Sequence, residues 1–237
     1  MRMQFPFRSL ALAGAMVVTS LGVSAQDGGK KELRHLVEIN TTMGRMVVEL
    51  YNETPLHRDN FLKLAREHYL DSTLFHRVIK GFMIQGGDPD SKKADDRTKP
   101  LGEGGPDYTI PAEFRPELFH RKGALAAARE GDDINPEKAS SGSQFYIVQG
   151  RTWRPSDLMA MDEKKNAGRP NGLAWHYTEA QKDVYWKTGG TPHLDGNYTV
   201  FGQVLEGMDV LDLIANQPTD GNDRPLTDVR MWVRVIQ

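Results

Sequence analysis

The sequence predicts a mainly β protein, a closed barrel of short strands whose open ends are covered by two α-helices, with a partly helical insertion. Two observations support this prediction. Short segments with alternating apolar residues recur along the chain. Outside residues 151–190, two segments have the apolar spacing of helices. Many short strands with two helices are typical of barrels that are plugged at their ends.

The first elements are a hairpin and a helix. Residues 26–35 are polar and form a short mobile lead-in. Residues 36–40 and 45–50 alternate on either side of a turn that ends in glycine, which predicts a β-hairpin. Thr54-Pro55 then supplies a candidate N-cap and a proline at the first helical position, so we expect a helix that ends near His68.

The later elements complete the barrel around the insertion. The alternating segments predict strands at 123–128, 144–148, 198–204 and 229–236, and residues 207–215 predict the second helix. The insertion, residues 151–190, is about forty residues long. Loops of that length without structure are uncommon, so we expect short helices packed beside the barrel, at residues 156–167 and 178–187.

Composition and charge describe a soluble globular protein of one domain. The 237 residues suffice for a sizeable core, and 38% hydrophobic with 26% charged residues is an ordinary balance. A general nucleic-acid binder would carry a basic patch, which a net charge of −2 argues against. We therefore expect no nucleic-acid partner.

Residues 1–25 have the pattern of a secretory signal peptide. Arg2 and Arg8 precede an apolar stretch that is too short and interrupted for a membrane span, and small residues lead to Ala25, where we expect cleavage. An uncleaved anchor is the alternative. The chain has no cysteine, hence no disulfide and no lipidation site. We expect a periplasmic protein without stable membrane insertion after cleavage, and secretion into the medium is equally compatible with the pattern.

The most specific feature is the run from Phe75 to Asp88, FHRVIKGFMIQGGD. It sets one arginine and one glutamine among bulky apolar side chains. Strand alternation places Arg77 and Val78 on opposite faces, and Gly81 marks a bulge or bend that re-aims the residues after it. This run resembles the signature of the cyclophilins, peptidyl-prolyl cis-trans isomerases.

The resemblance extends over residues 36–237 and includes a second run, from Thr191 to Gly202, with a Leu-Asp-Gly turn. It implies an eight-stranded barrel capped by two helices and a peptidyl-prolyl isomerase that acts on proline-containing polypeptides. Together with the N-terminal pattern, it identifies the chain as resembling an exported bacterial cyclophilin with a long insertion.

The chemistry of prolyl isomerisation explains why an arginine is expected in the active site. The reaction rotates a partial double bond over a barrier of roughly 18–20 kcal/mol and breaks no covalent bond, so it requires no metal, cofactor or nucleophile. The seven histidines show no short metal-ligand spacing either. A guanidinium, always charged and donating in a fixed fork, suits a twisted amide. We predict Arg77, Phe82 and Gln85 as catalytic residues; the alternative for Arg77 is an ordinary surface ion pair.

A proline ring needs an apolar slot, and burial of one apolar side chain is worth ~1.5–3 kcal/mol. The signature places Phe82 and Met83 in that slot. The resemblance adds Tyr146, at a position where phenylalanine is more usual, and Leu194. Ordinary core packing is the alternative role for Phe82 and Met83.

The resemblance assigns further substrate contacts. Ala128 and Arg129 lie where the family places the substrate against a strand edge, although the family typically has Ala-Asn-Ala there and this chain continues with Glu130. Gln85 is expected to hold the substrate backbone through its amide. Gln144 matches a glutamine beside the catalytic arginine and is expected to orient it.

Two further predicted substrate-binding residues depart from the family pattern. His193 stands where cyclosporin-sensitive members carry tryptophan, and Tyr198 where many carry histidine. Loss of the indole removes a donor and apolar area, which predicts weak cyclosporin binding. The expected function is isomerisation of X–Pro bonds in exported, folding proteins. Two alternatives stay open: the chain is a non-catalytic peptide-binding chaperone module, or residues 151–190 dock a dedicated partner and catalysis is secondary.

Overall fold

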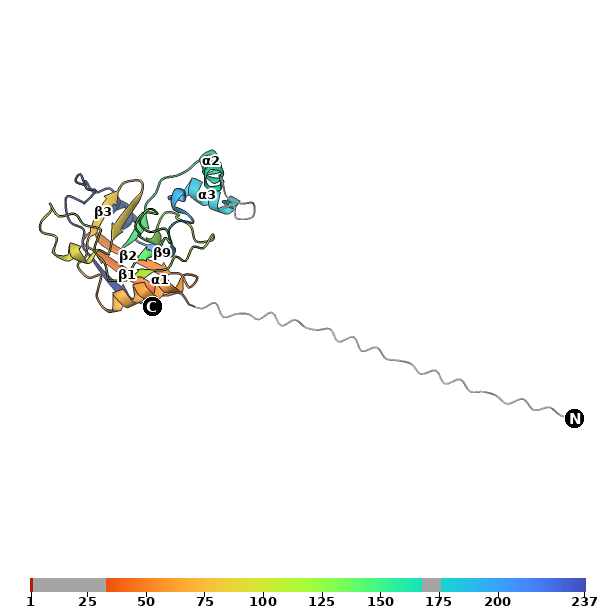
Figure 1. The fold of residues 1–237 in the computed structure, drawn as a ribbon, viewed down its shortest axis with the longest axis horizontal. Helices are drawn as coiled ribbons and strands as arrows, with labels where there is room; N and C mark the ends of the chain where they lie inside the picture. Colours follow the sequence, from red (N-terminus) through yellow and green to blue (C-terminus); the bar gives the residue numbers. More distant parts are fainter. Residues whose placement is uncertain (2–32, 168–175) are drawn as a thin grey trace. The chain divides into compact units, whose positions relative to one another are not determined.

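The computed structural model describes residue 1, residues 33–167 and residues 176–237 (Figure 1). The predicted signal peptide beyond Met1, the lead-in up to residue 32 and residues 168–175 of the insertion lie outside the described residues. Leu33–Gln237 forms one compact unit. Within the described residues, no helix has the length and apolar character needed to cross a membrane.

An eight-stranded sheet forms the body of this unit, with the strand order β10-β1-β2-β9-β6-β8-β4-β3 and antiparallel neighbours throughout. Its strands are β1 (Leu36–Thr41), β2 (Gly44–Leu50), β3 (Phe75–Ile79), β4 (Met83–Gly86), β6 (Ala124–Ala127), β8 (Phe145–Val148), β9 (Val200–Glu206) and β10 (Met231–Val235). Each predicted strand is present. A small sheet of β5 (Thr109–Ile110) and β7 (Ser140–Ser141) was not predicted.

The prediction of a closed barrel is confirmed only in part, because the sheet is strongly curled but no ladder joins β3 to β10. The two edges meet through the isolated bridge between Leu74 and Arg230 and a few backbone hydrogen bonds, such as that from Phe75 N to Val229 O at 2.9 Å. The chain before β10 instead folds on itself in a turn bridged between Thr219 and Pro225. This turn lies beside β3, where Val78 N donates to Asp223 O at 2.8 Å, but it forms no ladder with that strand.

Two helices pack on the sheet as predicted. Helix α1 (Pro55–Arg66) contacts β10 and β9, and α4 (Met208–Ala215) contacts β2, β4 and β3. Pro55 occupies the first turn of α1 as expected, but the Thr54 side chain makes no cap hydrogen bond. The two insertion helices are also confirmed, as α2 (Pro155–Asn166) and α3 (Glu179–Lys187), which pack on each other (Figure 1).

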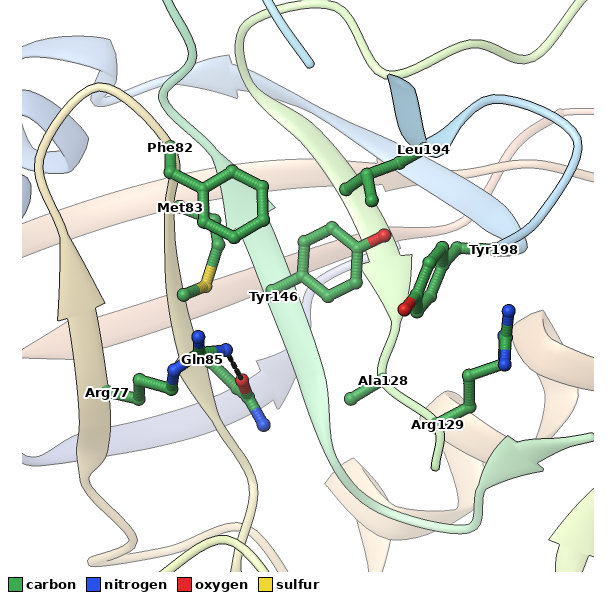
Figure 2. A pocket seen from close by; sticks show the side chains of 9 residues that line it. All are labelled: Arg77, Phe82, Met83, Gln85, Ala128, Arg129, Tyr146, Leu194 and Tyr198. Atoms are coloured by element: carbon green, nitrogen blue, oxygen red, sulfur yellow. Dashed lines mark hydrogen bonds between the residues drawn. The ribbon is translucent and has the colours of Figure 1, made fainter. Parts of the chain in front are cut away.

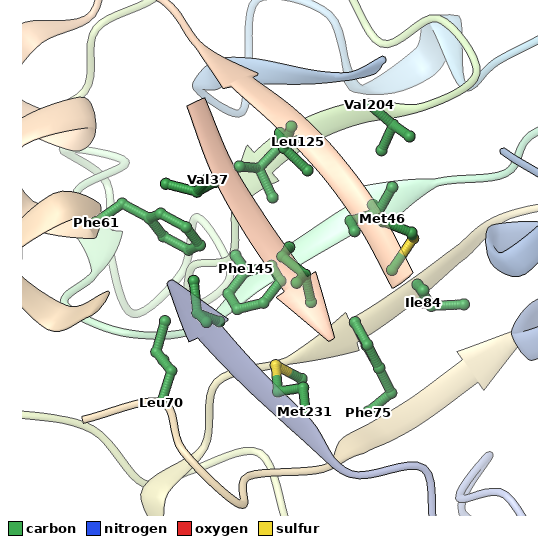
Figure 3. Packing of buried hydrophobic residues seen from close by; sticks show 14 of the residues in the cluster. Val37, Met46, Phe61, Leu70, Phe75, Ile84, Leu125, Phe145, Val204 and Met231 are labelled. Carbon is green, nitrogen blue, oxygen red and sulfur yellow. The ribbon is translucent and has the colours of Figure 1, made fainter. Parts of the chain in front are cut away.

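The two faces of the sheet carry separate apolar clusters. Along β8, Phe145 and Ile147 enter the large core cluster, whereas Tyr146 and Val148 belong to a cluster on the opposite face. Figure 3 shows the large cluster between the strands and α1, which contributes Phe61. Strand alternation of period two thus fills the core with one set of side chains and leaves the other for a site.

Candidate active site

A cavity of about 170 Å³ opens on the second face of the sheet. Its lining consists of Arg77, Phe82, Met83, Gln85, Ala128, Arg129, Tyr146, Leu194 and Tyr198 (Figure 2). These are nine of the eleven residues predicted from the sequence. The other two, Gln144 and His193, do not line the cavity but contact residues that do, as described below.

Sheet register explains why residues far apart in sequence meet in this cavity. Arg77 on β3 pairs with Gln85 on β4, Gln85 pairs with Tyr146 on β8, and Tyr146 pairs with Ala126 on β6. This row crosses four strands. Ala126 contributes only a methyl group next to the tyrosine ring, which leaves space above the sheet. Gly81 (φ 74°) makes the predicted bend between β3 and β4.

A chain of directed hydrogen bonds fixes the polar side of the cavity. The Gln144 side-chain amide donates to Gly102 O and Gly104 O, both at 2.8 Å, so its Oε1 faces Gln85. Gln85 Nε2 donates to that oxygen at 3.1 Å, and Gln85 Oε1 in turn accepts from Arg77 Nη1 at 3.3 Å. Gln144 thus orients Gln85, which contacts the arginine.

The Arg77 side chain keeps 44% of its surface exposed, and its Nε lies 3.7 Å from Asp223 Oδ2. A pair of this length between half-exposed groups contributes little to stability. The expected alternative, an ordinary surface ion pair, is therefore present only in a loose form. The guanidinium retains donors that are directed at the cavity it lines.

The apolar side of the cavity begins at Phe82. His193 does not line the cavity; its ring stacks on Phe82 with centroids 5.6 Å apart and planes at 29°. Behind His193 lies Trp153, whose ring centroid is 6.5 Å away. The insertion thus supplies a tryptophan next to His193.

The substrate-facing edge is held by Arg129, whose side chain closes over Tyr198 with the guanidinium carbon 4.4 Å from the ring centroid. Arg129 Nε also donates to Asn197 O at 2.8 Å, and its Nη2 pairs with Asp132 at 2.7 Å. The backbone of Ala128 is engaged at both ends, since its N–H donates to Gln144 O and its carbonyl accepts from Ser141 N.

Tyr146 forms one wall of the cavity and is tied to residues that sequence reasoning missed. Its hydroxyl lies 2.9 Å from Nε2 of His120, and His120 Nδ1 lies 2.7 Å from Asp195 Oδ1. Burial holds the pKa of Tyr146 well above its usual value, so its hydroxyl stays protonated. Asp195 was visible only as part of the Leu-Asp-Gly turn, and no local spacing marks His120 as its partner.

Among the described residues there is no group of three His, Cys, Asp or Glu side chains that could hold a metal ion. The arrangement offers a fixed cation, an oriented amide and an apolar cavity. It can bind a small apolar ring and donate hydrogen bonds to a polar group beside that ring.

Comparisons with known proteins agree with this site. The family model described as cyclophilin type peptidyl-prolyl cis-trans isomerase/CLD matches residues 36–234. A putative peptidyl-prolyl cis-trans isomerase of Staphylococcus aureus is 36% identical over 197 residues, which are 81% of this chain and 87% of that protein. A putative bifunctional phosphatase/peptidyl-prolyl cis-trans isomerase of Streptococcus pyogenes is 39% identical over 199 residues. This chain spans only 37% of the length of that protein.

Solved structures show the same fold. The crystal structure of a cyclophilin type peptidyl-prolyl cis-trans isomerase of Cryptosporidium parvum matches with a TM-score of 0.62 and 26% identity, covering 86% of this chain and 99% of that chain. A second structure of that protein, obtained in the presence of the dipeptide Ala-Pro, has a TM-score of 0.60 and 25% identity. Because the family match covers most of the chain and includes every residue of the cavity, the chain belongs to the cyclophilin-type peptidyl-prolyl cis-trans isomerases.

Proposed function

We propose that this chain accelerates rotation about X–Pro bonds by holding the proline ring in the cavity and stabilising the twisted amide with Arg77. The observation that carries the proposal is the pairing of Arg77 and Gln85 on one side of a cavity whose other side is formed by Phe82, Met83 and Leu194. The structural relative studied with Ala-Pro supports a proline-containing ligand.

The energetic role of the arginine follows from the reaction. As the C–N bond twists, resonance is lost and the prolyl nitrogen regains its lone pair. A positively charged donor beside that nitrogen is bound more strongly by the twisted amide than by the planar one, which lowers the barrier. Arg77 stands at the cavity edge with donors that its bond to Gln85 does not use.

The substrate backbone is proposed to lie along the edge formed by Gln85 and Arg129. Because the N–H and carbonyl of Ala128 are already engaged, main-chain hydrogen bonds to a peptide are assigned to Arg129. The Arg129 side chain is held in its contacts with Tyr198 and Asp132, and we infer that this position leaves the backbone edge open to the peptide.

We also propose that the enzyme acts on exported proteins. The support is the signal-peptide pattern in residues 1–25 and the absence of cysteine from the sequence. Uncatalysed X–Pro isomerisation takes tens to hundreds of seconds, slow enough to limit folding, so an exported catalyst has a use. Cell fractionation tests the export, which a cytoplasmic protein would contradict. Mass measurement of the chain tests the cleavage after Ala25, which an intact Met1 would contradict.

The test of the catalytic proposal uses residues 26–237, which include the compact unit 33–237. Isomerisation of a short Ala–Pro peptide is measured beside Arg77→Ala, with folding checked by circular dichroism. We expect a large acceleration that is lost in the variant. A folded wild-type protein that binds the peptide without accelerating its isomerisation would instead support the non-catalytic binding module.

A further inference from the structure

The insertion begins and ends at one point on the barrel. Gly190 forms isolated bridges to both Arg121 and Arg151, and its carbonyl accepts a hydrogen bond from Trp153 Nε1 at 2.9 Å. A Cβ at Gly150 would lie 2.3 Å from the Gly190 Cα, so the two backbones touch. We call this junction the neck of the insertion.

Directly after the neck comes the turn η2 (Pro192–Leu194), which carries the cavity residue Leu194. Both ends of this turn are held from the insertion. Lys165 Nζ, on α2, donates to Pro192 O and to Asp195 O, each at 2.8 Å. The Tyr177 hydroxyl donates to Pro192 O at 2.6 Å.

Asp195 joins the insertion to the barrel. Its buried carboxylate accepts hydrogen bonds from His120 N at 2.8 Å, from His120 Nδ1 at 2.7 Å and from the Tyr185 hydroxyl, on α3, at 2.5 Å. A carboxylate only accepts, so His120 must carry its proton on Nδ1. The other ring nitrogen, Nε2, lies 2.9 Å from the Tyr146 hydroxyl and shares a hydrogen bond with it.

A continuous chain of hydrogen bonds therefore links Tyr146 through His120 to Asp195, where it meets Tyr185. One end is a wall of the proline cavity and the other is a helix of the insertion. The Tyr185 ring also packs with Leu158 and Tyr177 in an apolar cluster separate from the barrel core. The large core cluster of the barrel thus contains no residue of the insertion. Tyr146 and Leu194 in the cavity wall, in contrast, are connected to the insertion through hydrogen bonds.

We propose that helices α2 and α3 are a brace for the proline cavity, in which Tyr185 and Lys165 are positioning residues that act through Asp195 and η2 on Tyr146 and Leu194. The inference rests on the proposed function of the cavity. Placement errors of an ångström in a binding site lower activity steeply. A cavity wall that is fixed in place therefore binds the proline ring more tightly. The brace acts on binding of the proline ring and not on Arg77.

The decisive variant is Tyr185→Phe, which removes the hydroxyl and keeps the ring in its cluster. Lys165→Met is the second variant and removes the cation from the two carbonyls of the turn. Two controls are matched to them. Tyr108→Phe removes a hydroxyl bonded to Asn60 on the surface, and Val233→Ala truncates a fully buried residue of the barrel core.

Kinetics and peptide affinity are measured for each variant with the same Ala–Pro peptide, well below the unfolding temperature. We expect Tyr185→Phe and Lys165→Met to raise KM and the dissociation constant about threefold to tenfold with kcat nearly unchanged, the signature of lost uniform binding. Both controls should leave KM unchanged, although Val233→Ala lowers stability. A double-mutant cycle of Tyr185→Phe with Leu194→Ala should be non-additive.

The outcomes separate the two proposals. A wild-type protein that isomerises, with Tyr185→Phe and Lys165→Met unchanged in KM and affinity or with additive effects in the cycle, would overturn the brace alone. A wild-type protein without turnover would overturn the catalytic proposal. In that case the affinities still test the brace, which stands if the two variants bind the peptide more weakly than the controls do.

Discussion

Arg77 bonds to Gln85 in preference to the nearest acid: Nη1 donates to Gln85 Oε1 at 3.3 Å, whereas Asp223 lies 3.7 Å from Nε. The arginine is therefore positioned by a neutral amide that is itself fixed by Gln144. A neutral partner leaves the full positive charge available to the substrate.

A lysine variant tests whether the charge of Arg77 is sufficient for activity or whether the planar shape of its guanidinium is also needed. Arg77→Lys keeps the charge but loses the planar fork that bonds to Gln85 and donates to the amide. We expect kcat/KM to fall about a hundredfold, as on loss of a single stabilising donor in other enzymes. The measurement is isomerisation of a short Ala–Pro peptide. Activity of the lysine variant equal to wild type would show that charge alone suffices.

Gln144→Leu tests the orientation of Gln85. The substitution removes the acceptor for Gln85 Nε2 and frees the side chain that contacts Arg77. We expect kcat/KM to fall about threefold to tenfold, in line with a coupling of about 1 kcal/mol. Gln217→Leu is the control, since among the described residues its amide bonds only to the Leu213 carbonyl on the surface. Equal activity of the two variants would contradict the orienting role.

His76 predicts acid sensitivity of the fold. Burial lowers its pKa from 6.5 to about 4, and neither ring nitrogen has a hydrogen-bond partner within the described residues. The unfolded chain therefore binds a proton that the folded chain does not between about pH 6.5 and about pH 4. Stability is full above about pH 6.5 and falls as the pH drops, by up to about 3 kcal/mol from this group.

The check is urea unfolding of wild type and His76→Leu across that pH range. The variant loses no hydrogen bond within the described residues, so at neutral pH its free energy of unfolding should change little. Its dependence on pH should be shallower than that of wild type. Some dependence should persist, because burial also lowers the pKa of His57. Parallel curves for the two proteins would exclude His76 as the source.

Cyclosporin binding should be weak. His193 lies outside the cavity lining and stacks on Phe82, so no indole donor faces the site from this position. Calorimetric titration should give a dissociation constant in the micromolar range or above. A nanomolar constant would contradict this prediction.

Local signals in the sequence predicted the elements well. The α3 start is an example: Thr178 Oγ1 accepts from Gln181 N at 3.2 Å, and Gln181 Oε1 accepts from Thr178 N at 3.0 Å. Such a box involves residues three apart, so it is visible in the sequence. Strand alternation likewise predicts Arg77 and Val78 on opposite faces, and the structure has Arg77 at the cavity and Val78 in the large core cluster.

Contacts between distant residues were not predictable in the same way. His120 and Asp195 are 75 residues apart and meet only because the chain after the insertion returns to the segment before β6. The edges at β3 and β10 meet through the isolated bridge between Leu74 and Arg230, another contact between distant residues. No periodicity encodes either feature, so both required the structure.

The touching backbones of Gly150 and Gly190 also bear on the order of folding. A loop whose ends are already joined adds little closure entropy as it lengthens, so the barrel does not need the insertion in order to form. We expect amide hydrogen exchange to be faster at Tyr185 and Leu194 than at Ile147, and activity to be lost in mild denaturant before the barrel unfolds. Equal protection at the three amides would contradict this order. We therefore expect the barrel to fold first, and the wall of the substrate cavity to be completed only when the insertion packs against it.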